Sequence, residues 1–515
     1  MTDKASVQAL TPLSPGTSPL THDNSLRTWK ILGWVGLLGL TLAVRLYQLV
    51  EPSLWQDEVW SINLARQPLN EMFELIRSQD LQPPLYYLLL RPVLALGIDN
   101  NFTLRGLAVL FDLLALWPLY LFARKMAGER AAWFAMLFFS LSAIHVIFSQ
   151  MVRMYTLLAL LVLLSFYLFW RIMQTLHPTW PLLIGYVATT SAMLYTQNLA
   201  ALYLVAQGLA LLILFRRKTL LIRAALLWAS SLLLWSPLLV IFLQQAAGNT
   251  FFDKPSILLL LDSFVAYGGA DKAHNGQPFA LLALAQPYFV LGLGLAVWLG
   301  LSNLRERRAE RTYLLLFWLV PLSLCWLISQ IKPIYADRAF LASSFSFFII
   351  LGAAFNRFDS TRPRVFKCFW GPLLGGGLAL LLSVAALVGL NTGGYAHDDL
   401  RGLGRDAAVQ LAGPNQARFL LQFNGNSPII FNHYTPPGSP ANLADYNQAT
   451  EKLLEAAGAG RICAITSTST ELLAVPRAAY QRFGGWLAAR SRQQSFFRQN
   501  YPDESLQLQC WDYQT

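Results

Sequence analysis

The sequence has few charged residues. Only 13% of its 515 residues are Asp, Glu, Lys or Arg, whereas soluble globular domains carry about a quarter. Hydrophobic residues make up 55% of the chain, and its mean hydropathy is +0.43. This composition excludes a soluble globular protein and predicts a polytopic membrane protein.

Cysteine and histidine are scarce as well. The four cysteines are too few for a disulfide framework. Cys463 and Cys510 lie in one polar tail and can pair if that tail is extracytoplasmic, whereas we expect Cys325 and Cys368 to be isolated thiols. The six histidines are scattered, and none has the spacing of a zinc site. No metal site or cofactor is evident from the sequence, and a divalent metal stays an open alternative.

Motifs of several enzyme classes are missing. The chain has no Walker loop, dinucleotide fingerprint, nucleophile elbow or internal repeat. Its formal net charge of +11 does not indicate nucleic-acid binding, because the basic residues fall in short clusters between apolar runs, as in cytoplasmic loops. We therefore expect no nucleic acid among its partners, and membrane lipids around its spans.

Long apolar runs, by contrast, are abundant. Windows of about twenty residues predict eleven membrane spans, near 31–50, 105–123, 131–149, 154–170, 181–197, 198–215, 224–243, 280–301, 313–330, 339–355 and 370–390. No small-residue cleavage site ends the first run, so we interpret it as a span and not as a signal peptide. If the N-terminus is cytoplasmic, every strong basic cluster between spans also falls on the cytoplasmic side.

This topology divides the chain into three parts. Residues 1–30 form a cytoplasmic segment, residues 31–390 a transmembrane domain, and residues 391–515 a soluble extracytoplasmic domain. In the tail, helical patterns alternate with short strand-like segments. The helical patterns lie near 400–412, 446–457 and 476–497, and the strand-like segments at 429–431, 462–465 and 506–508. The sequence therefore predicts an all-α membrane domain followed by a small α/β domain.

The outer loop 51–104 differs from an ordinary connection. Its segment 64–76 alternates apolar and charged residues, which predicts an amphipathic helix on the membrane surface. The apolar run at 85–96 is too short to span and is expected to lie at the interface or to enter the membrane partway. Residues 256–266 in a later outer loop have the same character. These segments are expected to roof a site that faces outward.

Polar residues capable of chemistry collect in these outer loops. Asp57 and Glu58 form a carboxylate pair just beyond the first span. The candidate binding residues on the same side are Gln82, Tyr86, Gln150, Arg153, Tyr155, Lys332 and Arg338. A carboxylate accepts the proton of an acceptor hydroxyl or amine, and fixed positive charge stabilises a phosphate leaving group. The pattern favours glycosyl transfer from a lipid phosphate.

The order of the motifs adds a family resemblance. The chain has Leu-Trp-x-Asp-Glu at 54–58, Pro-Pro-Leu-Tyr-Tyr at 83–87 and Ser-Gln-x-x-Arg-Met-Tyr at 149–155. Together these motifs resemble the glycosyltransferase family 39-like enzymes of the protein O-mannosyltransferase and aminoarabinose transferase superfamily, whose membrane fold is called GT-C. The resemblance covers roughly residues 30 to 355. It implies a polyprenyl-phosphate-linked sugar donor, an extracytoplasmic acceptor, and Asp57 as general base.

Three positions depart from that family pattern. Many of the proteins that the chain resembles have His before the Pro-Pro pair, an acidic residue after Ser-Gln, and Tyr-Thr-His in a later span. This chain has Gln82, Met151 and Gln197 at those positions. Three ionisable groups are thus replaced by neutral ones, so a non-catalytic relative that binds a lipid-linked sugar stays an alternative. A lipid-linked glycan ligase or polymerase is the other.

We therefore expect a glycosyltransferase of the cell envelope, in a plasma or inner membrane, that inverts the sugar during transfer. Asp57 and Glu58 are its candidate catalytic residues. Simpler interpretations stay open for each residue. The carboxylate pair can cap the helix that follows, Arg153 can anchor the chain at the interface, and Arg338 can pair with its neighbour Asp337. Within the apolar spans, Arg105 and Asp112 can pair with each other, and His145 can be a satisfied packing residue.

Overall fold

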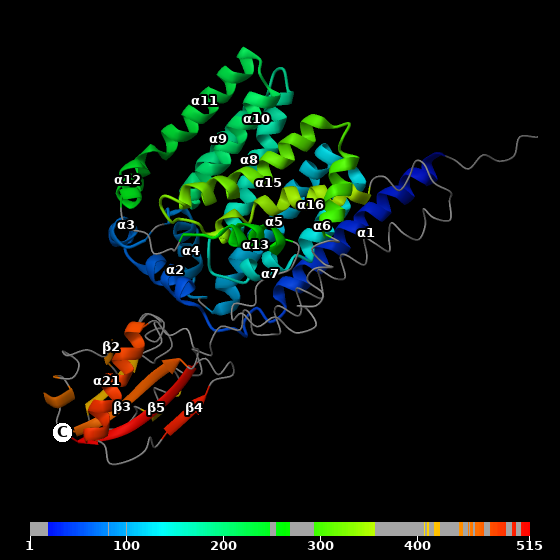
Figure 1. Cartoon of the computed structure of the whole chain (residues 1–515). Coiled ribbons are helices and arrows are strands. Elements are labelled where there is room, and N and C mark those ends of the chain that lie inside the picture. Colours follow the sequence, from blue (N-terminus) through cyan, green and yellow to red (C-terminus); the bar gives the residue numbers. More distant parts are fainter. Residues whose placement is uncertain are drawn as a thin grey trace, which may run out of the picture.

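The computed structural model describes most of the predicted membrane domain and parts of the tail. The described residues are 19–80, 82–98, 100–247, 254–267 and 293–355, followed by segments between 406 and 514. Figure 1 shows a bundle of helices and, separate from it, a small sheet at the end of the bundle where α2 lies. The architecture is thus mainly helical, as expected.

Most of the described helices follow one another with short connections. The first ten are α1 (Pro19–Leu46), α2 (Gln56–Arg66), α3 (Leu69–Ser78), α4 (Leu85–Ala95), α5 (Asn101–Ala127), α6 (Glu129–Ser140), α7 (Ala143–Ser149), α8 (Tyr155–Gln174), α9 (Trp180–Thr196) and α10 (Ala201–Leu214). Next come α11 (Lys218–Trp235), α12 (Leu239–Ala247), α13 (Ile257–Ala266), α15 (Arg308–Ser329) and α16 (Ser343–Ala354). Short 3-10 turns named η1 (Asn198–Ala200), η2 (Ser236–Leu238) and η3 (Asp337–Phe340) lie before α10, α12 and α16.

Five helices among the described residues are long and apolar enough to cross a membrane. They are 28–46 of α1, α5, α8, the run 218–246 through α11 and α12, and α15. The bent pair of α6 and α7, which meet at 56°, would make a sixth. The expected count of eleven is not confirmed, because helices such as α16 are shorter than a span. All of α16 is buried, so it packs inside the bundle. The expected span at 370–390 lies outside the described residues.

The first outer loop holds three helices, α2 to α4. The single surface helix expected at 64–76 is wrong in its bounds, because Pro68 separates α2 from α3. Proline lacks a backbone N–H and disfavours helical geometry in the residue before it. The helix α3 buries Met72 and Ile76, which is the amphipathic character that the sequence predicted. The apolar run at 85–96, which the sequence predicted to be too short to span, forms the helix α4 of 11 residues.

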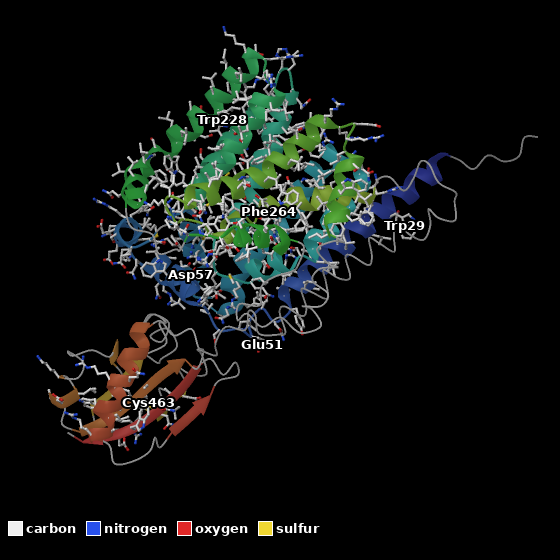
Figure 2. The ribbon with its side chains drawn as sticks, viewed as in Figure 1. Trp29, Glu51, Asp57, Trp228, Phe264 and Cys463 are labelled. Atoms are coloured by element: carbon white, nitrogen blue, oxygen red, sulfur yellow. A yellow bond between two sulfur atoms is a disulfide. The ribbon has the colours of Figure 1, made fainter. Side chains whose placement is uncertain are left out.

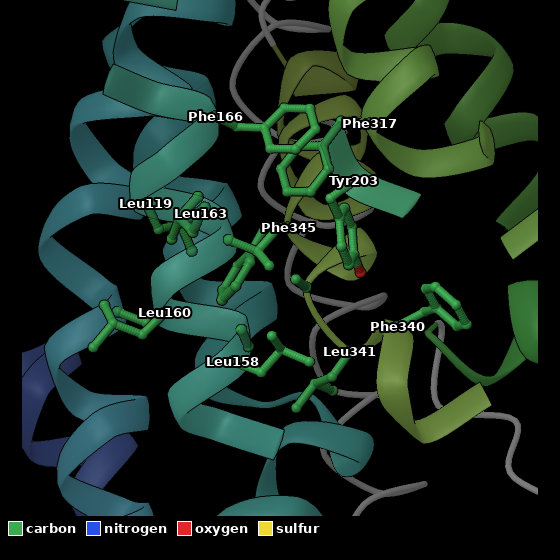
Figure 3. Packing of buried hydrophobic residues seen from close by; sticks show 14 of the residues in the cluster. Leu119, Leu158, Leu160, Leu163, Phe166, Tyr203, Phe317, Phe340, Leu341 and Phe345 are labelled. Atoms are coloured by element: carbon green, nitrogen blue, oxygen red, sulfur yellow. The ribbon is translucent and has the colours of Figure 1, made fainter. Parts of the chain in front are cut away.

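Aromatic side chains fill the centre of the bundle. Phe166 of α8 stacks on Phe317 of α15 with ring centroids 3.9 Å apart, and Tyr203 of α10 meets Phe317 edge-on at 5.9 Å. Figure 3 shows these rings, with Phe345 of α16 close by. Such ring contacts add to the burial of large apolar surfaces. They hold α8, α10, α15 and α16 together and thereby fix the ends from which the outer loops leave.

A buried charge network joins four helices of the bundle, α1, α5, α7 and α16. Arg45 of α1 donates to Asp112 of α5 at 2.5 Å, and the second Asp112 oxygen lies 2.8 Å from His145 Nδ1 of α7. The Nε2 atom of His145 lies 2.8 Å from Ser344 Oγ of α16. All four side chains are 0% exposed. His145 is therefore a satisfied packing residue, and its hydrogen bond to Ser344 joins α7 to α16.

The described residues of the tail include five strands, which form one sheet, and the helix α21 (Ala474–Arg490). The strands are β1 (Ala417–Gln422), β2 (Asn442–Asp445), β3 (Ala459–Ser467), β4 (Phe497–Asn500) and β5 (Leu506–Gln514), in the order β2-β1-β3-β5-β4. β1 runs parallel to β2 and β3, whereas β5 is antiparallel to β3 and β4. Phe483 of α21 packs against Trp511 of β5. Cys463 and Cys510 face each other on β3 and β5 and form a disulfide.

Several segments that the sequence predicted in the tail coincide with elements of this sheet or with α21. The strand-like segments at 462–465 and 506–508 lie within β3 and β5, and α21 covers most of the helical pattern at 476–497. Three expected segments lie wholly or mostly outside the described residues: 429–431, 400–412 and 446–457. The predicted domain boundary after residue 390 also lies outside them.

The Arg45 network gives a prediction about stability. Asp112→Asn removes the negative charge from a fully buried pair and leaves the Arg45 guanidinium without a counter-ion. We expect the free energy of unfolding to fall by about 3–5 kcal/mol, measured by thermal unfolding in detergent. The exposed Glu71 of α3 supplies the control: Glu71→Gln should leave the melting temperature unchanged. Equal melting temperatures for both variants would show that the network does not stabilise the bundle.

Candidate active site

Asp57 lies in the first turn of α2, where a helix N-terminus favours a carboxylate. Figure 2 shows it at the end of the helical bundle that is nearer to the strands of the tail. Its side chain is 37% exposed. One oxygen, Oδ2, lies 3.8 Å from Arg153 Nη2 and 4.0 Å from Arg338 Nη2. The structure thus brings together three predicted site residues that are far apart in the sequence, and the carboxylate stays accessible between two cations.

Arg153 lies in the turn between α7 and α8. Its side chain is buried, and its Nη1 donates to Ser61 Oγ at 3.1 Å and to the Asp57 carbonyl oxygen at 3.4 Å. The Nε donor is buried and has no hydrogen-bond partner among the described atoms. The guanidinium lies over the ring of Tyr155, 5.9 Å from its centroid. Arg153 is therefore not an anchor that reaches into the interface, and it keeps one buried donor unused.

Arg338 reaches Asp57 from the η3 turn. The sequence left a local pair with Asp337 open, but the contact with Asp337 comes from the backbone N–H of Arg338, which donates to Oδ1 at 2.7 Å. The guanidinium points to Asp57 instead. Tyr267 holds the turn by donating to the Phe340 carbonyl at 2.8 Å. Tyr335 contacts Ser263 of α13 at 2.8 Å, so α13 braces the segment that carries Arg338.

Glu58 has a different environment from its neighbour Asp57. Its carboxylate is buried and receives two hydrogen bonds from Arg105, each of 3.1 Å. It also accepts from the backbone N–H groups of Trp55 and Val152, both at 2.9 Å. The first of these is one half of a capping box. All four of these hydrogen bonds hold elements of the fold together. They do not support the predicted catalytic role of Glu58 and favour its alternative role as a helix cap.

The partner of Arg105 corrects another sequence interpretation. The sequence left a pair between Arg105 and Asp112 along α5 open. Arg105 instead binds Glu58, and Asp112 binds Arg45. Arg105 also donates to the carbonyl groups of Leu49 and Ser53, at 2.8 and 3.0 Å. A single guanidinium therefore fastens the segment between α1 and α2 to α5.

The N-terminal end of α4 contributes uncharged groups to this region. The Tyr86 hydroxyl and Gln82 Oε1 are buried atoms without a hydrogen-bond partner among those described. Burial raises the pKa of Tyr86, the Glu58 charge raises it further and the Arg153 charge lowers it, so the hydroxyl stays protonated. Nearby, Asp80 accepts from Tyr87 Oη at 2.6 Å and from Trp60 Nε1 at 3.3 Å. Asp80 therefore shapes the loop, whereas Tyr86 and Gln82 have capacity left.

Three other predicted binding residues have structural partners. Gln150 donates through Nε2 to the carbonyl groups of Arg45 and Tyr47 at the end of α1, at 3.0 and 2.8 Å. The Lys332 ammonium binds the Ala246 carbonyl oxygen near the end of α12, where a helix favours a cation. Tyr155 is buried against Phe148. For Gln150 and Lys332, the contacts that the structure records lead to helix ends and not to Asp57.

Ser61 is a site residue that the sequence did not reveal. It lies one helical turn after Asp57 on α2, donates through Oγ to the Asp57 carbonyl oxygen at 2.8 Å, and accepts from Arg153. The spacing of four residues on one helix was the available signal. As to metals, no group of three or more His, Cys, Asp or Glu side chains in the described part of the chain is placed to hold an ion.

The contrast between the adjacent carboxylates can be tested by stability. Glu58→Gln leaves Arg105 buried without its counter-ion, and we expect it to lower the free energy of unfolding by about 3–5 kcal/mol. Asp57→Asn removes longer and more exposed contacts, so the expected loss is about 1 kcal/mol or less. Thermal unfolding of both variants in the same detergent measures the difference. A larger loss for Asp57→Asn would contradict the structural role of Glu58.

Sequence comparison gives a partial match. A family model described as dolichyl-phosphate-mannose-protein mannosyltransferase matches residues 81–241. That segment contains α4 to α11 and the turn that carries Arg153, but it is less than half of the chain. No curated protein matches the sequence.

Comparison with solved structures covers nearly all of the chain. The chain is similar to ArnT from Cupriavidus metallidurans in the apo state, with a TM-score of 0.60, 13% identity, and coverage of 93% of this chain and 98% of ArnT. It is also similar to the same protein bound to undecaprenyl phosphate, at a TM-score of 0.56, 14% identity and the same coverage. The archaeal oligosaccharyltransferase AglB from Archaeoglobus fulgidus matches at a TM-score of 0.53 and 11% identity, over 85% of this chain and 69% of AglB. These similarities show that the chain has the GT-C fold of membrane glycosyltransferases.

Proposed function

We propose that the chain is an integral membrane glycosyltransferase that transfers a sugar from a polyprenyl-phosphate carrier to an extracytoplasmic acceptor with inversion. One observation carries this proposal: the accessible Asp57 carboxylate lies between the guanidinium groups of Arg153 and Arg338. A base and two fixed cations, at one end of a membrane bundle, are the groups that such a reaction needs.

The chemistry follows from these charges. Asp57 accepts the proton of the acceptor hydroxyl or amine as its oxygen or nitrogen attacks the anomeric carbon of the sugar. The bond between that carbon and the phosphate oxygen breaks, and the phosphate leaves with the electron pair. Arg153 and Arg338 stabilise the charge that develops on the phosphate. Attack opposite the leaving group inverts the anomeric configuration.

The structural relatives support a lipid carrier. ArnT was solved bound to undecaprenyl phosphate, and AglB in complex with a dolichol-phosphate and an inhibitory peptide. The present chain shares their fold and has the cation pair that a phosphate requires. The polyprenyl tail would reach the site from the bilayer between helices, because a chain of such apolarity does not cross water. The acceptor would approach from the aqueous side, where Asp57 is exposed.

The disulfide in the tail supports the proposed orientation. Cys463 and Cys510 are joined between β3 and β5. Disulfides persist in oxidising compartments and are rare in the cytosol, which favours an extracytoplasmic C-terminal domain and a cytoplasmic N-terminus. In Figure 1 this domain lies at the end of the bundle that carries α2, so the same orientation exposes Asp57 outside the cytoplasm.

A second candidate is a non-catalytic protein that binds a lipid-linked sugar. It is favoured by one observation: Met151 and Gln197, which replace ionisable residues of the family pattern, are both buried. No titratable group is present at those two positions. The retained Asp57 opposes this candidate, and turnover distinguishes it from the enzyme.

The role of Asp57 can be tested directly. The purified protein in lipid is given synthetic polyprenyl-phosphate monosaccharides, with total membrane lipid as acceptor, and sugar release is measured. Because Asn cannot accept a proton, we expect Asp57→Asn to lower turnover by about 100-fold or more while donor binding survives. Equal turnover would remove Asp57 from the mechanism, and donor binding without turnover in the native protein would favour the non-catalytic candidate.

Variants of Arg338 and Lys332 provide a test of phosphate binding and its matched control. Both residues are partly exposed cations in the same outer segment, but only the Arg338 guanidinium contacts Asp57. We expect Arg338→Gln to weaken binding of the bare polyprenyl phosphate by about tenfold, and Lys332→Met to leave it unchanged. Binding titrations in lipid nanodiscs measure both. A loss confined to the Lys332 variant would place the phosphate elsewhere.

A further inference from the structure

The Asp57 carboxylate and the Arg153 guanidinium lie close together without forming a hydrogen bond. We infer that the buried Ser61 hydroxyl is a positioning group that keeps the two apart, so that one stays free as a base and the other stays open to an anion. This inference rests on the proposed function and adds a residue to its site. Ser61 touches neither the donor nor the acceptor in this role and acts through Arg153.

The distance between the two charged groups is the first observation. Arg153 Nη2 lies 3.8 Å from Asp57 Oδ2, whereas a charge-assisted hydrogen bond between such groups is about 2.7–2.9 Å long. The neighbouring pair of Arg105 and Glu58, which is buried, closes to 3.1 Å. The pair of Asp57 and Arg153 is therefore an open one, although the guanidinium is buried and a carboxylate is within reach.

Ser61 supplies the acceptor that Arg153 uses in place of this carboxylate. Arg153 Nη1 donates to Ser61 Oγ at 3.1 Å, and Ser61 Oγ donates in turn to the Asp57 carbonyl oxygen at 2.8 Å. A hydroxyl has one donor and can accept at the same time, so one group serves both contacts. Because α2 carries Ser61 one turn after Asp57, the hydroxyl fixes the guanidinium relative to the base.

The other contacts of the Arg153 side chain restrain it less. Within the described part of the chain, its Nε donor has no hydrogen-bond partner, and the second contact of Nη1, with the Asp57 carbonyl oxygen, is 3.4 Å long. The ring of Tyr155 covers one face of the guanidinium at 5.9 Å. Since a guanidinium is planar, this ring and the hydrogen bond to Ser61 together set the direction of Nη2, which faces the Asp57 carboxylate.

Loss of the Ser61 hydroxyl would release the guanidinium. Nη1 would keep only the long contact with the Asp57 carbonyl oxygen, and a buried donor without a good acceptor is disfavoured. We expect Arg153 to close onto the Asp57 carboxylate, which engages the base and the cation together. Asp80 also acts electrostatically on Arg153, and a turn toward Asp80 would withdraw the cation from the site. Either movement should lower phosphate binding and turnover.

The test compares Ser61→Ala with a matched serine of the next helix. Ser78 of α3 is exposed and donates to the Glu74 carbonyl oxygen at 2.7 Å, with the same spacing of four residues, but no described cation donates to it. We expect Ser61→Ala to weaken binding of bare polyprenyl phosphate in lipid nanodiscs by about tenfold and to lower kcat for a polyprenyl-phosphate monosaccharide. Ser78→Ala should change neither. Ser61→Thr keeps the hydroxyl and should bind as the native protein does.

A double-mutant cycle shows whether Ser61 acts through Arg153. Arg153→Gln removes the guanidinium, so adding Ser61→Ala to that variant should change neither the phosphate affinity nor kcat any further. The melting temperature is measured for every variant. We expect Ser61→Ala to melt within a few degrees of the native protein, because alanine is the strongest helix former and the substitution lies within α2.

The outcomes separate this inference from the proposed function. Native affinity and kcat in Ser61→Ala, an equal loss in Ser61→Thr, or a loss of the same size after Arg153 is replaced would each overturn the inference and leave a glycosyltransferase. Unfolding of Ser61→Ala would show that the hydroxyl serves the fold, and would overturn the inference as well. If the native protein binds neither polyprenyl phosphate nor the donor, the proposed function fails and the inference fails with it.

Discussion

The ion pair between Glu58 and Arg105 is the interaction on which the site depends. It joins the start of α2 to α5, and the same carboxylate accepts the backbone N–H of Val152. Asp57 and Arg153 are each the immediate chain neighbour of a residue held in this way. The geometry of the base and of one cation is therefore a consequence of a buried pair that takes no part in the proposed chemistry.

A second buried network supports the other cation. His145 links Asp112 to Ser344, near the start of α16. The η3 turn with Arg338 lies directly before that helix. Because charges in an apolar interior must be paired, both networks act as fixed points within a bundle that is otherwise held by aromatic and aliphatic packing. The two cations approach Asp57 from turns that these fixed points position.

The polar residues at the outer end of the bundle fall into two groups, those with a hydrogen-bond or ionic partner in the protein and those without one. Glu58, Asp80, Gln150 and Lys332 have partners within the protein and hold loops or helix ends. Tyr86, Gln82 and the Nε atom of Arg153 are buried without one. A native fold rarely leaves buried polar atoms unsatisfied, so the unused Arg153 donor beside the accessible Asp57 carboxylate favours a ligand as the missing partner.

The sequence by itself determined the membrane class, the helical positions of most apolar runs, and the candidacy of Asp57, Arg153 and Arg338. These features depend on local composition and on motif order, which are properties of the chain before it folds. Only the tertiary structure decided which neighbour of a pair does which task. Asp57 and Glu58 are adjacent and chemically alike, yet one is exposed between two arginines and the other is buried against Arg105. That difference arises because Arg105 of α5 and the backbone N–H of Val152 bind Glu58 and not Asp57, and contacts between residues so distant in the chain leave no local signal.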